Sequence, residues 1–211
     1  MLFRSGEVHL DEAFTEERLQ AGLAQKFPVL HIASHFKFSA GTEADSFLLM
    51  GDGSKLSLQD VRRRYRFAGV DLLTLSACET AFGGGEDSNG REVEGFATLA
   101  QSRGARAVLA TLWPVADEST SRMMQTMYSN REKQKLTKAA AVRQSQLALL
   151  TGNVLGSDGK APVVGPEVWR GAQRNPLSSS TQQQPLFVLD AKKPFAHPYY
   201  WAPFILMGNW L

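Results

Sequence analysis

The chain has 211 residues, 43% hydrophobic and 21% charged, a composition typical of a globular domain with a sizeable core and not of a disordered chain. Its 23 basic and 21 acidic side chains leave a formal net charge of +2, which gives no electrostatic reason to expect nucleic acid or an anionic membrane as the main partner. The single cysteine excludes an internal disulfide, and no apolar run predicts a membrane span or a secretory signal, so we expect a cytoplasmic protein.

Short apolar runs predict five β-strands, and segments with helical spacing separate most of them. The strands are expected over 29–33, 46–50, 70–75, 107–113 and 200–207. The helices are expected over 15–25, 57–65, 93–100, 117–131 and 137–150. Thr15 and Ser57 are suitable N-caps for the first two helices, and Gly104 is suited to ending the third. Residues 36–45 and the glycine-rich 83–90 are expected to be loops.

Most of these strands are apolar along their whole length instead of alternating with polar residues, which is typical of a parallel sheet covered by helices on both faces. Functional groups of such sheets gather at the carboxyl ends of the strands. His35 follows the strand at 29–33, and Cys78 follows the strand at 70–75. The sequence therefore predicts that both side chains face one crevice at the same edge of the sheet.

A thiolate nucleophile needs a partner that manages protons, and histidine is the usual one. Cys78 has four candidate partners, which are His9, His31, His35 and His197. His35 is favoured because it lies at a strand exit, whereas His31 is inside the strand and is expected to point into the packing. A lone cysteine after an apolar strand is also typical of a small core residue, and a loop histidine is often only a surface group.

Four blocks of the sequence resemble the motifs of CHAT domains, which are relatives of caspases and separases. They are HIASHF at 31–36, LSACET at 75–80, LWPVADES at 112–119 and HPYYWAPF at 197–204. The resemblance implies a single α/β domain over 1–211, a caspase-like three-layer sandwich whose mostly parallel sheet carries helices on both faces. The chain starts close to the histidine motif, so we expect that it lacks the N-terminal part of such a domain.

The resemblance also implies roles for single residues. Cys78 corresponds to the nucleophile and His35 to its acid–base partner, and the backbone N–H groups of Phe36 and Cys78 correspond to the oxyanion hole. Many relatives carry glycine at the position of Phe36, so the larger side chain is expected to narrow the approach to that donor. Asp117 resembles an acid that lines the substrate pocket in separases and would favour a basic residue. As an alternative, it starts a helix, where acids cap N–H groups.

The expected function is a cysteine endopeptidase that acts on a protein or peptide substrate without a metal or cofactor. The alternatives are a catalytically silent interaction or regulatory module, and a thiol-dependent hydrolase or transferase of small molecules. The family also suggests a helical-repeat (TPR-like) sensor or activator as a partner. Residues 151–194, rich in Gly, Pro, Ser and Gln, are expected to form a flexible loop where cleavage could activate the enzyme.

Overall fold

A four-stranded sheet forms the centre of the molecule. The computed structural model of the chain describes residues 6–37, 39, 43–76, 91–113, 116–154 and 190–211, with only the backbone for 91–94. The strands are β1 (Val29–Ile32), β5 (Leu72–Leu75), β6 (Ala107–Thr111) and β7 (Phe204–Gly208), in the spatial order β1-β5-β6-β7. The first three run parallel, and β7 is antiparallel to β6.

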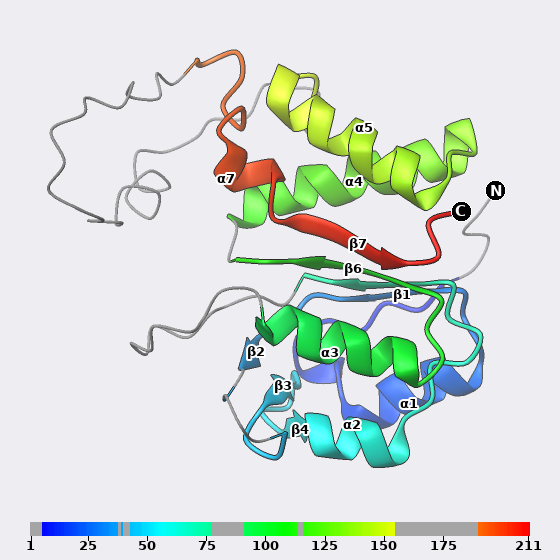
Figure 1. Ribbon diagram of the computed structural model, residues 1–211. Helices are drawn as coiled ribbons and strands as arrows, with labels where there is room; N and C mark the ends of the chain where they lie inside the picture. The colour runs from blue at the N-terminus through cyan, green and yellow to red at the C-terminus, as the bar shows by residue number, and fades with distance from the viewer. Residues whose placement is uncertain (1–5, 38, 40–42, 77–90, 114–115, 155–189) are drawn as a thin grey trace, which may run out of the picture.

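Helices cover both faces of this sheet (Figure 1). On one face lie α1 (Glu16–Ala24), α2 (Leu58–Arg64) and α3 (Arg91–Ser102), and on the other lie α4 (Asp117–Gln134), α5 (Lys138–Thr151) and α7 (Pro198–Trp201). A 3-10 turn, η1 (Asp11–Ala13), precedes α1. The predicted α/β three-layer sandwich with a mostly parallel sheet is confirmed. No helix in the described ranges is long and apolar enough to cross a membrane.

A second, smaller sheet lies beside the main one and contains three antiparallel strands. These are β2 (Phe36–Lys37), β3 (Phe47–Leu49) and β4 (Lys55–Ser57). The strand predicted at 46–50 therefore exists but does not join the main sheet. The loop predicted over 36–45 is wrong at its start, because Phe36 and Lys37 pair with Leu48 and Phe47.

The predicted N-caps and the glycine helix end are confirmed. Thr15 Oγ1 accepts a hydrogen bond from the backbone N–H of Arg18 at 3.3 Å, and Ser57 Oγ accepts one from Asp60 at 3.0 Å. Gly104 follows α3 with a φ of +112°, a backbone conformation that L-residues rarely adopt. These signals are readable from the sequence because each acts within one turn of the chain.

The last predicted strand begins later than expected. Residues 198–201 form the short helix α7, and β7 starts only at Phe204. His197 is the N-cap, because its Nδ1 accepts a hydrogen bond from the Tyr199 N–H at 3.1 Å, and Pro198 occupies the first helical position. The aromatic run at 199–201 has high strand propensity, but this local cap outweighs it.

Two hydrophobic clusters pack against the two faces of the sheet. Alternation along β5 directs Leu73 and Leu75 toward α2 and α3, and Leu72 toward α4 and α5. Leu73 and Met127, one from each cluster, are completely buried. The sheet is thus covered on both faces, which explains why its central strands are mostly apolar on both sides and do not alternate with exposed polar residues.

Candidate active site

The chain around His35 is held by the smaller sheet. His35 lies between β1 and β2, its side chain is exposed, and its carbonyl accepts a hydrogen bond from the Leu49 N–H at 2.8 Å. The Ser34 hydroxyl donates to the Leu49 carbonyl at 2.5 Å. Both residues are therefore anchored to β3, which leaves the imidazole of His35 at the surface just beyond the carboxyl end of β1.

Phe36 directs its side chain into the core and its backbone N–H away from β3. The ring is 5% exposed and meets the edge of Phe96 from α3, with a centroid distance of 5.6 Å. Its bulk therefore fills the core, and the expected narrowing of the approach to its backbone is not supported. Hydrogen-bonded pairs alternate along antiparallel strands, so the bond between Leu49 and His35 makes Phe36 and Leu48 a non-hydrogen-bonded pair. The Phe36 N–H consequently points away from β3.

The strands that lead to His35 and Cys78 are direct neighbours. β1 and β5 pair in parallel, with Ile32 opposite Leu75, and the Ser76 N–H donates to the Ile32 carbonyl at 2.9 Å. Their carboxyl ends therefore lie at one edge of the sheet, as the sequence predicted. Cys78 itself lies outside the described residues, so the distance between its sulfur and His35 stays untested.

Asp117 is the first residue of α4, and its side chain is exposed. The N-cap is Ala116, which makes no side-chain capping hydrogen bond, so Asp117 is not the N-cap of α4. Its negative charge in the first turn still interacts favourably with the helix dipole. It lines a surface depression of about 290 Å³ together with Glu118, Ser121, Arg122 and Gln125. Glu118 accepts a hydrogen bond from Arg122 at 2.9 Å. The carboxylate of Asp117 thus lies at the surface of α4 beside the ion pair of Glu118 and Arg122.

The other histidines occupy different places. His9 contacts Glu7 at 3.3 Å in the N-terminal segment, and His197 caps α7. His31 points toward the face of the main sheet that α4 covers, where its ring packs against Tyr128, as expected for a residue inside the strand. Because β1 is an edge strand of the described sheet, part of the side chain stays open to solvent. Within the described ranges, no group of three or more His, Cys, Asp or Glu residues is placed to hold a metal ion.

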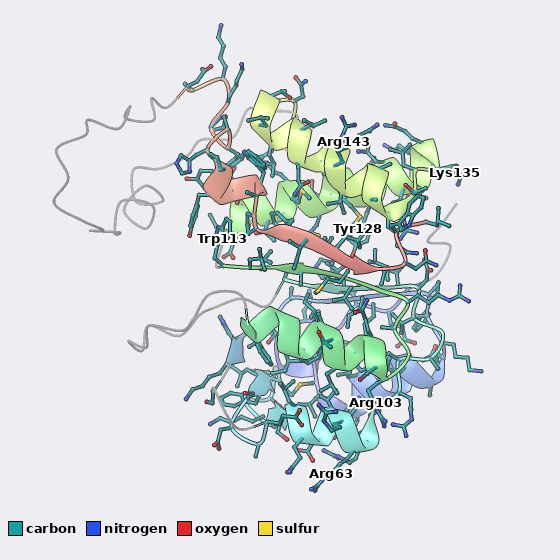
Figure 2. The ribbon with its side chains drawn as sticks, viewed as in Figure 1. Arg63, Arg103, Trp113, Tyr128, Lys135 and Arg143 are labelled. Atoms are coloured by element: carbon teal, nitrogen blue, oxygen red, sulfur yellow. The ribbon has the colours of Figure 1, made fainter. Side chains whose placement is uncertain are left out.

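His31 belongs to a polar network that the sequence did not predict. Its Nε2 lies 2.9 Å from Ser76 Oγ, and its Nδ1 lies 3.3 Å from the hydroxyl of Tyr128 on α4. The Tyr128 hydroxyl also donates to Thr74 Oγ1 at 2.9 Å. In Figure 2, Tyr128 lies between α4 and the sheet. From the sequence, the alternation of side chains along β1 could have shown only that His31 lies on the opposite face of the sheet from Ile32. It could not have shown which residues His31 contacts there.

The network is uncharged near neutral pH. Burial of the ring lowers the pKa of His31, although part of the side chain reaches solvent, and burial raises the pKa of Tyr128 to about 12. Neutral imidazole has one N–H and one acceptor nitrogen. Because Tyr128 donates to Thr74, His31 Nδ1–H donates to the Tyr128 oxygen, and Nε2 accepts the hydroxyl proton of Ser76.

Comparison with protein families matched the CHAT domain over residues 1–209. The chain belongs to the CHAT domain family. This match contains all four blocks and includes 151–194, where the resemblance of the sequence is weakest. CHAT domains are related to caspase-like cysteine peptidases, which agrees with the three-layer fold. A comparison with curated proteins found no match.

Proposed function

We propose that this CHAT domain is a cysteine endopeptidase with Cys78 as nucleophile and His35 as its acid–base partner. The observation that supports it most is the parallel pairing of β1 with β5, because it brings the ends of the strands before His35 and Cys78 to one edge of the sheet. The exposed His35 side chain adds to this support, since a general acid–base must reach the substrate.

The proposed reaction has two steps. His35 takes the proton of the Cys78 thiol, and the resulting thiolate attacks the peptide carbonyl. His35 then donates this proton to the leaving amine, which departs as a thioester forms. His35 then removes a proton from water, whose oxygen attacks the thioester, and the thiol and the new carboxyl group are released. The N–H groups of Phe36 and Cys78 stabilise the oxyanion in both steps, an effect commonly worth about 3 kcal/mol per donor. The direction of the Phe36 N–H, away from β3, supports its part in this role.

The decisive experiment is cleavage of a diverse peptide library, with the product ends identified by mass spectrometry. We expect cleavage by the wild type and a loss of kcat/KM on the order of a thousandfold or more in Cys78→Ala and in His35→Ala. His9→Ala is the matched control and should cleave like the wild type, because His9 contacts Glu7 in the N-terminal segment and has no proposed part in the reaction. Cleavage that persists in Cys78→Ala would refute the proposal. A folded wild type that cleaves nothing would favour the catalytically silent module.

We further propose that Asp117 favours a basic residue before the cleaved bond. Its carboxylate is exposed on the concave surface at the start of α4, where it can face a cationic side chain. Asp117→Asn should reduce the preference for Lys or Arg among the product ends by roughly tenfold. Glu118→Gln is the control, since Glu118 lines the same depression but already pairs with Arg122. An unchanged preference in Asp117→Asn would assign the selectivity to other residues.

A further inference from the structure

Two hydrogen bonds tie Ser76 to β1 just before the chain continues toward Cys78. The Ser76 N–H donates to the Ile32 carbonyl at 2.9 Å, and its hydroxyl oxygen lies 2.9 Å from His31 Nε2. The first bond continues the ladder of the parallel pair, whereas the second is made by the imidazole of His31. In the sequence, Cys78 follows Ser76 by two residues and His35 follows His31 by four.

Contacts on the other side of the ring hold His31 in place. Tyr128 approaches Nδ1 at 3.3 Å, and the two rings lie 5.8 Å apart between centroids with an angle of 42°. Tyr128 also bonds to Thr74, the residue that lies opposite His31 in the register of β1 and β5. A side chain with both ring nitrogens occupied has little rotational freedom, so it can set the position of Ser76.

A hydrophobic residue would be the simpler choice for position 31 if only packing mattered. Its neighbours Leu30 and Ile32 are apolar, and Val29 packs against the α4 side of the sheet. A polar network at a strand end adds geometric specificity, because hydrogen bonds hold one arrangement whereas apolar contacts allow several. This network joins the same two strands that lead to the proposed catalytic pair.

We propose that His31 is a positioning residue, which fixes through its bond to Ser76 the direction in which the chain leaves β5 toward the nucleophile. The inference rests on the proposed function, but it makes a separate claim about the thiol. Loss of the bond leaves Ser76 tied to β1 by its N–H alone, so its side chain no longer restrains the chain beyond β5. It therefore lowers the reactivity of Cys78 without changing how substrate side chains are recognised.

The test uses the fact that Cys78 is the only cysteine, so alkylation of the full chain by iodoacetamide reports on one thiol. His31→Ala and Ser76→Ala should each slow alkylation at neutral pH by about two- to tenfold, the range expected for one hydrogen bond. The double variant should lose no more than either single variant, because both remove the same bond. With a peptide substrate, kcat should fall by a similar factor while KM stays unchanged.

Three comparisons make the result decisive. His9→Ala is the matched histidine control and should alkylate at the wild-type rate. Circular dichroism shows whether each variant folds. If His31→Ala does not fold, Ser76→Ala is used for the test, because it removes only one oxygen atom. Wild-type alkylation rates in folded variants, or losses that add in the double variant, would overturn the inference. A wild type that cleaves no peptide but shows the alkylation pattern would retain the positioning role and refute only the peptidase.

Discussion

Lys138 is a cation that is almost fully buried, with 2% of its side chain exposed. Its Nζ donates to Asp71 Oδ1 at 2.9 Å and to the carbonyl of Leu211 at 2.6 Å. Arg131, also largely buried, reaches the other oxygen of Asp71 at 3.5 Å. A single carboxylate at the start of β5 thus balances two cations at the junction between α4 and α5.

Removal of that carboxylate should be costly, because it leaves two buried cations without a counter-charge. We expect Asp71→Ala to lower the free energy of unfolding by about 2 to 4 kcal/mol, measured by urea denaturation. Glu43→Ala is the matched control, since its partner Arg62 is half exposed and such pairs contribute about 0 to 1 kcal/mol. Equal losses in the two variants would show that burial does not govern the Asp71 cluster.

The residues near the candidate site differ in how far the sequence could place them. The ends of β1 and β5 were predictable, since short apolar runs before His35 and Cys78 mark them directly. The inward direction of the Phe36 side chain was not predictable, because it depends on pairing with Leu48 of β3, which lies beyond a loop. The contact of His31 with Tyr128 joins residues 97 positions apart, and no local pattern carries that information.

Gly104 follows the end of α3 at a position where a side chain would not fit. It links α3 to β6 with a φ of +112°, and a Cβ atom there would lie 2.9 Å from the backbone nitrogen of Ala68. Glycine therefore allows both the turn of the chain and the close approach of the segment before β5. The glycine was recognisable as a helix end, but its close neighbour was not.

Gly104→Ala should lower the free energy of unfolding by about 2 to 3 kcal/mol, as expected for a strained φ together with a backbone clash. Gly53→Ala separates the two causes, because Gly53 also has a positive φ of +82° but no atom lies within 4 Å of its added Cβ. The control should lose only about 1 kcal/mol. Thermal or urea unfolding measures both, and equal losses would argue against the clash.

The main sheet lies between the two hydrophobic clusters and contributes side chains to both. Because neighbouring residues of β5 enter opposite clusters, neither layer of helices can separate without exposing the sheet (Figure 1). We expect the two layers to unfold in a single cooperative transition.

Leu73→Ala and Met127→Ala test this expectation, one in each cluster and both completely buried. Each should lower the free energy of unfolding by about 2 to 5 kcal/mol through a lost transfer term and a cavity. The transitions followed by far-UV circular dichroism and by tryptophan fluorescence should shift together. If one variant uncoupled the two signals, the layers would be separate units.

The sequence by itself determined the local elements and the order in which they occur. Helix caps, glycine ends and apolar runs are contacts within a few residues, so they can be read along the chain. The four motif blocks likewise indicated the CHAT family, which the match over 1–209 shows. Tertiary structure alone decided that 46–50 leaves the main sheet, that β1 is an edge strand and that His31 meets Ser76 and Tyr128. These features depend on which distant segments share a face, and that is settled by burial of the whole core.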